Sequence, residues 1–428
     1  MTDRDLTGLL ERASADLPEV DFASDAWADA YAAQSRRRRR LTTGVGAVAA
    51  AALAVGAVQV WGTDGSENRT PTPAVTATTP PVTGTLADGT AYAELPLEGK
   101  EPELPQLDVG LPTSIDTGRS RMMLSALRGD PPTVVGVTLE PTTPELKAYR
   151  LLLIRPGGEL LEVDGLTLKP VRDTGGNEAM PLGTRAIGGA GMVAFPQPGE
   201  VVVVDRGGEV TRFPVPSEYL QEVSWTPSND SVVIRSDDGK VWTLDPWRPG
   251  AKAVKVDDPA DTAVTGLRVA EENQSLSVTW NDLITGKRAG QRTIGAPVYE
   301  LWKRPVGSAT WVASGAFFDQ GVTSEVIRRG NGPIYQGVVA VRPDQGKAKL
   351  LLAPENPDGQ EGRYKGCCTP LAWWNASTVL LQTNGSHGSW ILAWNVDTGE
   401  VSRVTRIAYD PKTDAAPSQL ALNIGWRY

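Results

Sequence analysis

The chain has 428 residues, of which 40% are hydrophobic, so it is long enough to bury one large core or two smaller ones. Its net charge is −9, and its one dense basic run consists of Arg36, Arg37, Arg38, Arg39 and Arg40. Nucleic-acid binding relies on a basic surface stripe, so we expect no nucleic-acid partner. One histidine and two adjacent cysteines rule out the usual Cys/His zinc sites, and we expect no metal and no cofactor.

The first 40 residues form an acidic tail that ends in the arginine run. Residues 1–35 carry eight acidic side chains and only two arginines before that run. The apolar residues there recur at the spacing of one helix face, which predicts a short amphipathic helix ended by Pro18. This apolar face consists of Leu6, Leu9, Leu10, Ala13 and Leu17.

Residues 41–61 follow the arginine run and contain no charged side chain, and the next charge is Asp64. Twenty-one residues span about 30 Å as a helix, which matches the hydrocarbon thickness of a bilayer. We therefore predict a transmembrane helix that ends at an interfacial aromatic residue, Trp61. Because the arginines lie on one flank only, the positive-inside rule places the N-terminus in the cytoplasm and the rest of the chain outside.

A cleaved export signal is the alternative interpretation of this region. Ser35, Arg36 and Arg37 before a mildly apolar segment resemble a twin-arginine signal, and the alanine-rich sequence near residues 55–58 offers a cleavage site. The 35 residues before the arginines are long for a signal, and the apolar segment is long for its core. These lengths favour a retained anchor.

Residues 62–94 are expected to be an extended linker. Residues 62–90 contain nine threonines and four prolines, as in the run at 70–73 and the run at 78–81. A segment of this composition cannot bury a core, and it is typical of a stalk that holds a domain away from a membrane.

Residues 95–428 are predicted to be all-β, because short apolar runs alternate with turns rich in glycine, proline, aspartate and asparagine. The sequence from 223 to 245 gives strand, polar turn, strand, tight turn and strand, and residues 371–404 repeat this pattern. Hairpin glycines recur about every 48 residues, at 157, 207, 239, 286, 346 and 399. This period predicts a β-propeller-like domain of six or seven blades, closed by a strand at 422–426. A pair of β-sandwiches or a β-solenoid is the structural alternative.

The pattern Trp225-Thr226-Pro227, followed by Asp238-Gly239 and a strand containing Trp242, resembles WD-repeat and TolB-like propellers. The Gly-His and Trp-Asp signatures of true WD repeats are absent, so the resemblance implies the architecture alone. The tail, arginine run and outer domain together also look like actinobacterial membrane proteins associated with extracytoplasmic-function sigma factors. The zinc-binding His-x-x-x-Cys-x-x-Cys sequence of many anti-sigma factors is absent.

No catalytic motif was found by spacing: the chain lacks Gly-x-Ser-x-Gly, His-Glu-x-x-His and a phosphate-binding loop. His387 lies among glycines and serines and is interpreted as an exposed turn residue. In an oxidising compartment, Cys367 and Cys368 can close a vicinal disulfide that rigidifies their loop. Buried thiols, or pairing between molecules, are the alternatives. Most of the 13 tryptophans are expected to pack between blades.

We therefore expect a single-pass protein of the cell membrane whose outer propeller serves in binding, sensing or scaffolding. Its expected partners are the membrane, a protein, peptide or glycan on the propeller face, and a cytoplasmic partner of residues 1–35. The rival hypothesis is an exported hydrolase or lyase on a propeller scaffold, released by signal cleavage. The sequence favours a protein that is not an enzyme.

Overall fold

A computed structural model describes residues 82–118, 120–142, 145–188, 191–226, 229–256, 266–270, 275–281, 288–308, 310–318, 336–354, 367–385, 388–408 and 420–423. The chain divides into two compact units, Met1–Ala74 and Val75–Tyr428, and every described residue belongs to the second. No helix in the described ranges is both long and apolar enough to cross a bilayer. The predicted tail (1–40) and anchor (41–61) lie outside these ranges.

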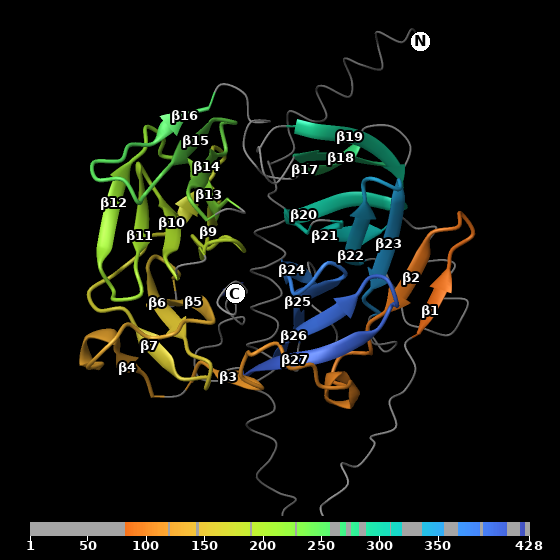
Figure 1. Cartoon of the computed structure of the whole chain (residues 1–428), viewed down its shortest axis with the longest axis horizontal. Helices are drawn as coiled ribbons and strands as arrows, with labels where there is room; N and C mark the ends of the chain where they lie inside the picture. The colour runs from red at the N-terminus through yellow and green to blue at the C-terminus, as the bar shows by residue number, and fades with distance from the viewer. Residues whose placement is uncertain are drawn as a thin grey trace, which may run out of the picture. The chain divides into compact units, whose positions relative to one another are not determined.

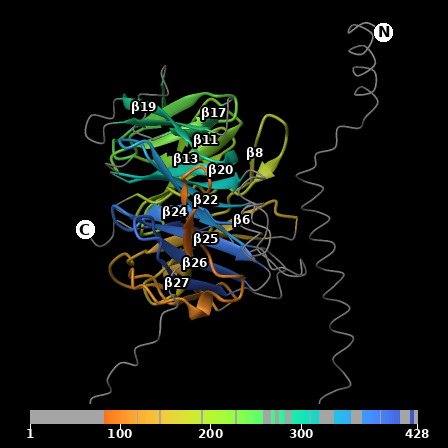
Figure 2. The same ribbon diagram turned by 90° about the vertical axis from the view of Figure 1, so that its right-hand side faces the viewer.

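The prediction of an all-β domain is confirmed. Within the described residues the helices are two short 3-10 turns, η1 (Glu101–Glu103) and η2 (Leu124–Ala126). Six sheets of three or more strands, numbered here in chain order, account for nearly all strands. One further hairpin, β8 (Val171–Arg172) and β9 (Glu178–Ala179), pairs with none of these sheets and projects to one side in Figure 2.

The first three sheets are built from the N-terminal half of the domain and one C-terminal strand. Sheet 1 has the order β28 (Leu420–Leu422), β5 (Gly136–Pro141), β6 (Tyr149–Ile154), β7 (Leu160–Glu162) and β4 (Met122–Met123). Sheet 2 consists of β10 (Val193–Gln197), β11 (Glu200–Val204) and β12 (Val210–Pro214). Sheet 3 consists of β13 (Leu220–Trp225), β14 (Val232–Ser236), β15 (Val241–Leu244) and β16 (Val254–Lys255).

The other three sheets are built from the C-terminal half of the domain, together with strands β1, β2 and β3 from its N-terminal segment. Sheet 4 consists of β17 (Gly266–Ala270), β18 (Ser275–Asn281) and β19 (Arg288–Gly295). Sheet 5 has the order β1 (Thr83–Thr85), β2 (Ala91–Glu94), β23 (Lys347–Leu352), β22 (Gln336–Arg342), β21 (Val312–Phe318) and β20 (Val298–Gly307). Sheet 6 has the order β24 (Thr369–Trp373), β25 (Thr378–Gly385), β26 (Gly388–Asn395), β27 (Val401–Ala408) and β3 (Ser114–Asp116).

The sheets pack face to face in a propeller-like arrangement (Figure 1). Separate clusters of buried apolar side chains join sheets 1 and 2, 2 and 3, 4 and 5, 5 and 6, and 6 and 1. Among the described residues no such cluster joins sheets 3 and 4. The contact between sheets 6 and 1 brings the last sheet against the first, as ring closure requires.

The predicted count of six or seven blades is not reached. Within the described ranges, four sheets have the four or more strands of a complete blade, namely sheets 1, 3, 5 and 6. Sheets 2 and 4 have three strands each. The estimate from glycine spacing counts hairpins, and a three-stranded sheet supplies a hairpin glycine just as a complete blade does.

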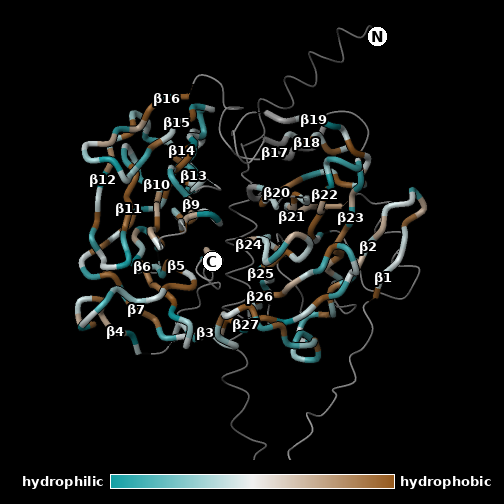
Figure 3. The backbone as a smooth tube through the Cα atoms, viewed as in Figure 1, coloured by the Kyte–Doolittle hydropathy of each residue, from teal (hydrophilic) through white to brown (hydrophobic). Residues whose placement is uncertain are grey.

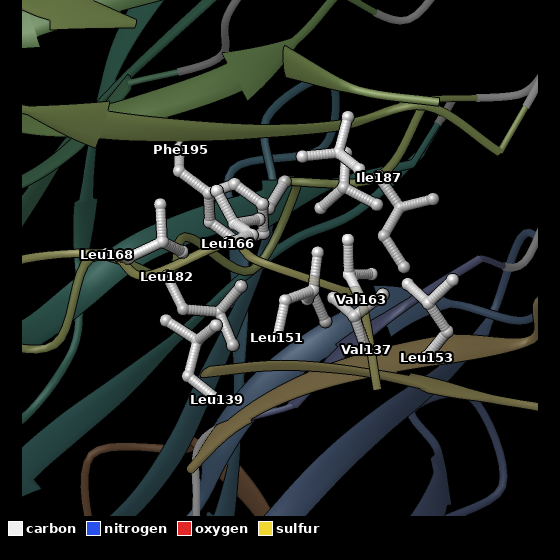
Figure 4. Close-up of a cluster of buried hydrophobic side chains, with 14 of the residues drawn as sticks. Val137, Leu139, Leu151, Leu153, Val163, Leu166, Leu168, Leu182, Ile187 and Phe195 are labelled. Carbon is white, nitrogen blue, oxygen red and sulfur yellow. The ribbon is translucent and has the colours of Figure 1, made fainter. Parts of the chain in front are cut away.

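Strand β11 shows why the sequences of the strands are continuous apolar runs. Val202 and Val204 pack toward sheet 1, whereas Val201 and Val203 pack toward sheet 3. Successive side chains of a strand point to opposite faces, and here both faces are buried. Apolar stretches accordingly lie along β11 and β26 in Figure 3. Figure 4 shows the cluster between sheets 1 and 2, where Phe195 lies among leucines of sheet 1 and the loop that follows it.

Hairpin turns predicted from glycines are confirmed wherever the structure describes them. Turns near residues 157, 207, 239, 346 and 399 each join two adjacent antiparallel strands. At the turn between β14 and β15, Gly239 has a φ of 79°, which glycine adopts without strain. The predicted hairpin at 285–287 lies outside the described residues.

The C-terminal strand closes the ring, as the sequence predicted, although it lies slightly earlier than residues 422–426. Strand β28 pairs antiparallel with β5, and Leu420 pairs with Thr138. Asn423 then donates from its main-chain N to the Val135 carbonyl (2.9 Å) and from Nδ2 to the Val134 carbonyl (3.0 Å). Residues 424–426 lie outside the described ranges.

Residues 82–118 and 120–123, here called the strap, add outer strands to three consecutive sheets. Strand β2 pairs in parallel with β23, β3 with β27, and β4 with β7. The strap therefore joins sheets 5, 6 and 1 along their outer edges, whereas β28 lies at the opposite edge of sheet 1 from strap strand β4. Its first strands, β1 and β2, fall within residues 62–94, where the sequence suggested a linker.

Candidate functional site

The residues singled out for membrane topology, Arg36 to Arg40 and Trp61, lie outside the described part of the chain, as does His387. The two cysteines are described. No group of three or more His, Cys, Asp or Glu side chains in the described ranges is arranged to hold a metal ion.

Cys367 and Cys368 lie at the start of sheet 6, fully buried against sheet 5, and their sulfur atoms are joined in the structure. Cys368 has a φ of 80°, so the chain turns sharply just before β24. The Cys367 N–H donates to Oε1 of Gln336, a buried residue at the start of β22 (3.2 Å). The pair therefore fixes the beginning of β24 against sheet 5, which is a structural role.

We predict that the disulfide forms in the protein itself. The intact mass of the purified chain should be lower than that of the reduced chain by two hydrogen atoms. Alkylation in denaturant should modify neither cysteine unless a reductant is added first, and the reduced sample serves as the control. Two alkyl groups on the unreduced chain would show that the cysteines are free thiols.

An aromatic group lies on the same side of sheet 5 as Gln336. Phe317 is the cross-strand partner of Gln336 and contacts Trp302, with ring centroids 4.3 Å apart. Tyr299 stacks on Phe317 at 5.8 Å and is 56% exposed. Gly315 makes this packing feasible, because a Cβ there would lie 2.3 Å from Nε1 of Trp302. The group therefore consists of one exposed ring, one half-buried ring and one buried ring.

Tryptophans mostly pack within and between sheets, which confirms the prediction for those the structure describes. Trp225, Trp242, Trp311 and Trp394 are buried, whereas Trp247 is exposed. Trp225 also donates from Nε1 to the Ala186 carbonyl (2.9 Å), so its polar atom is satisfied.

Paired charges cross sheet 1 and attach the end of the strap. Arg121 forms ion pairs with Glu140 and Glu162, the latter at 3.8 Å. Arg150 contacts the same two carboxylates, at 3.2 Å and 3.5 Å. Two glutamates are close together here, and each forms ion pairs with two guanidinium groups. This network is suited to holding the strap and not to acid–base catalysis.

Several polar residues that the sequence analysis did not single out belong to sheet 3 and to the segment that leads into sheet 2. They are Arg185, which precedes β10, and Gln221, Glu222 and Ser224 of β13. The Ser224 hydroxyl donates to Glu222 (2.9 Å), whereas no hydrogen bond or ion pair engages the Arg185 side chain among the described residues. Burial lowers the pKa of Arg185, and the charge of Glu222 offsets this only in part.

The β8–β9 hairpin, on the chain segment leading to Arg185, is itself attached to sheet 3. Thr174 donates from its main-chain N (2.9 Å) and its hydroxyl (2.5 Å) to Asp237 in the turn after β14. These bonds hold the pKa of Asp237 below its usual range. The segment between the hairpin and β10 is therefore fixed at both ends.

Comparisons with known proteins do not identify a family. No family model and no curated protein matches the chain. Among solved structures, hydrazine synthase of Kuenenia stuttgartiensis is similar over 62% of this chain and 78% of that chain, with 12% identity and a TM-score of 0.35. A likeness at this level carries no argument about function, which must be inferred from the chain's own residues.

Proposed function

We propose that the protein is a single-pass membrane protein of the actinobacterial type that displays a WD-repeat- or TolB-like propeller outside the cell. Binding, sensing or scaffolding is its role. The observation that carries this proposal is the run Arg36 to Arg40 directly before 21 residues without a charge. The propeller is compatible with such a role, because its described residues show packing and paired charges and no catalytic constellation.

Two further observations support the outward placement. A disulfide between Cys367 and Cys368 suits an oxidising compartment outside the cytoplasm. The threonine- and proline-rich residues 62–81 directly precede β1, so they connect the anchor to the outer edge of sheet 5. Residues 1–35 are then left in the cytoplasm, where their acidic helix is available to a partner.

Cysteine labelling in whole cells tests this topology directly. Cys367 and Cys368 are the only native cysteines, and they are buried and bonded to each other. Maleimide labelling therefore reports on the introduced cysteine alone. A membrane-impermeant maleimide should label Ser66→Cys in intact cells and should label Ser24→Cys only after lysis. Labelling of both variants in intact cells, or of neither, would contradict the proposed orientation.

Fractionation with intact-mass measurement separates the anchor from the export signal. We expect the full-length chain in the membrane fraction, and we expect it to lose its fixed orientation when the five arginines are replaced by glutamine. A soluble product beginning near residue 58 would instead indicate signal cleavage. That result would remove the basis for a cytoplasmic partner and favour a released propeller.

A further inference from the structure

We propose that the propeller ring opens between sheets 3 and 4, with the junction of sheets 6 and 1 as its hinge. Sheets 1–3 and sheets 4–6 then move as two halves. The inference goes beyond the proposed binding role and does not depend on it. A ligand that binds the open or the closed state better shifts the equilibrium between them, so binding can act on the shape of the domain through this junction.

Each half is held together by buried apolar side chains. Separate clusters join sheets 1 and 2, 2 and 3, 4 and 5, and 5 and 6. In the first half, Trp225 of sheet 3 also donates from Nε1 to the Ala186 carbonyl beside sheet 2 (2.9 Å). In the second half, Arg292 of sheet 4 donates from Nη1 to the Pro343 carbonyl of sheet 5 (2.8 Å). Sheets within one half are therefore tied to each other.

The junction between sheets 6 and 1 has several attachments. A buried apolar cluster spans it, and the N–H of Leu420 in β28 donates to Oε1 of Gln382 in sheet 6 (3.3 Å). The chain passes between the two halves three times, from β3 to β4, from β16 to β17 and from β27 to β28. Two of these passages join sheet 6 to sheet 1, and one joins sheet 3 to sheet 4. The first junction is therefore the one suited to be a hinge.

Sheets 3 and 4 are neighbours at the top of the ring in Figure 1, and we call their junction the seam. Trp225 and Ile234 belong to the cluster shared with sheet 2, and successive side chains of a strand point to opposite faces. Ser224 donates to Glu222 (2.9 Å), and Glu222 is the cross-strand partner of Arg235. The face of sheet 3 turned away from sheet 2 is therefore polar apart from two valines, and it carries Glu222, Ser224, Val233, Arg235, Val241 and Thr243.

The other side of the seam is polar as well. Leu276 and Ile294 belong to the cluster between sheets 4 and 5. The opposite face of sheet 4 carries Ser275, Ser277, Thr279, Gln291 and Thr293. Gln291 donates from Nε2 to the Ser277 hydroxyl (3.3 Å). Ser224 and Ser277 are only 7% and 6% exposed, so both faces are covered when the ring is closed.

This difference in composition sets where the ring opens. Separation of two apolar faces exposes them to water, which is unfavourable in proportion to their area. Separation of two polar faces replaces hydrogen bonds within the protein by hydrogen bonds to water, at a much smaller net loss. Of the junctions among the described residues, the seam is the one without an apolar cluster, so it should separate first.

The test measures how fast introduced thiols react in the folded, full-length chain in detergent, where the native cysteines are bonded and buried. Ser224→Cys and Ser277→Cys place a thiol on each side of the seam. Ser236→Cys is the matched control, because Ser236 is also 7% exposed but lies on the face of sheet 3 toward sheet 2. Ser314→Cys reports on the junction of sheets 4 and 5.

We expect both seam thiols to react with a maleimide at least about tenfold faster than the two control thiols. Their rates should rise less steeply with urea than the rate of global unfolding, because opening exposes less surface. Global stability is measured for each variant by urea unfolding, so that a change in overall stability is not mistaken for opening. Two seam variants on different sheets keep the test valid if one of them fails to fold.

Three results would overturn the proposal. The first is equal rates for seam and control thiols, or seam rates that follow global unfolding in urea. The second is fast reaction of Ser314→Cys together with Ser277→Cys, which would show that sheet 4 detaches by itself. The third concerns the hinge: Thr138 is the cross-strand partner of Leu420 and faces sheet 6, so Thr138→Cys should react as slowly as the controls. Fast reaction there would place the opening at the junction of sheets 6 and 1.

Discussion

A chain truncated after residue 419 should lose the closure of its propeller and unfold at a markedly lower temperature. The truncation removes β28, whose Leu420 and Leu422 are 2% and 6% exposed and pack between sheets 6 and 1. Burial of two leucines contributes about 3 to 6 kcal/mol of unfolding free energy. In a domain of this size that corresponds to a fall in the midpoint on the order of 10 °C.

Besides the buried apolar contacts, the truncation removes two sets of hydrogen bonds. Removal of β28 exposes the inner edge of β5, an unpaired strand edge that favours aggregation. Gln382 of sheet 6 also loses the hydrogen bond that its Oε1 accepts from the Leu420 N–H (3.3 Å). The midpoint should therefore fall, and the chain should aggregate on heating sooner than the intact protein.

A chain ending at Asn423 is the matched control. It keeps β28 and both hydrogen bonds from Asn423 to Val134 and Val135, so its midpoint should stay close to that of the full chain. Circular dichroism or tryptophan fluorescence follows the transition. Equal midpoints for the two truncations would show that β28 does not carry the closure.

Much of the fold was predictable, because strands in a ring bury both faces and are separated by short glycine turns. The strand that contains Trp242 was placed within a residue, whereas the strand that ends at Trp225 begins at Leu220, three residues earlier than expected. Local hydrogen bonding and apolar periodicity were sufficient there. Closure by a C-terminal strand followed from the general requirement that a ring has no free edge.

The strap could not be predicted in the same way. Strands β3 and β4 have three and two residues, and their parallel partners are more than 30 residues away or nearly 300 residues away in the chain. So short a strand has no periodicity to detect, and its pairing is fixed by a distant edge.

The replacement Ile115→Ala should weaken the attachment of the strap and the closure of the ring together. Ile115 is the central residue of β3, fully buried, and it pairs with Ile407 of β27. Removal of a buried isoleucine side chain in favour of alanine costs about 2 to 5 kcal/mol. Limited proteolysis should then cut the strap at lower protease concentration, because its hydrogen bonds to β27 open more often.

A strap residue outside the core provides the control for Ile115→Ala. Leu97 is 37% exposed, so Leu97→Ala should change the unfolding free energy by less than about 0.5 kcal/mol. Equal effects of the two replacements would show that the strap is not held by β3. Hydrogen bonds from Arg406 N to the Thr113 carbonyl (3.0 Å) and from the Thr405 hydroxyl to the Pro112 carbonyl (2.7 Å) make that outcome unexpected.

A double-mutant cycle decides whether the strap and β28 close the same junction. Ile115 and Leu420 belong to one buried cluster between sheets 6 and 1, whereas Leu276 belongs to the cluster between sheets 4 and 5. Alanine replacements of Ile115 and Leu420 should therefore be non-additive by about 0.5 to 3 kcal/mol, and those of Ile115 and Leu276 should add. Such coupling would mean that a partner pulling on the strap through residues 62–81 acts directly on the closure of the propeller. Additivity in both cycles would instead separate the anchor connection from ring closure.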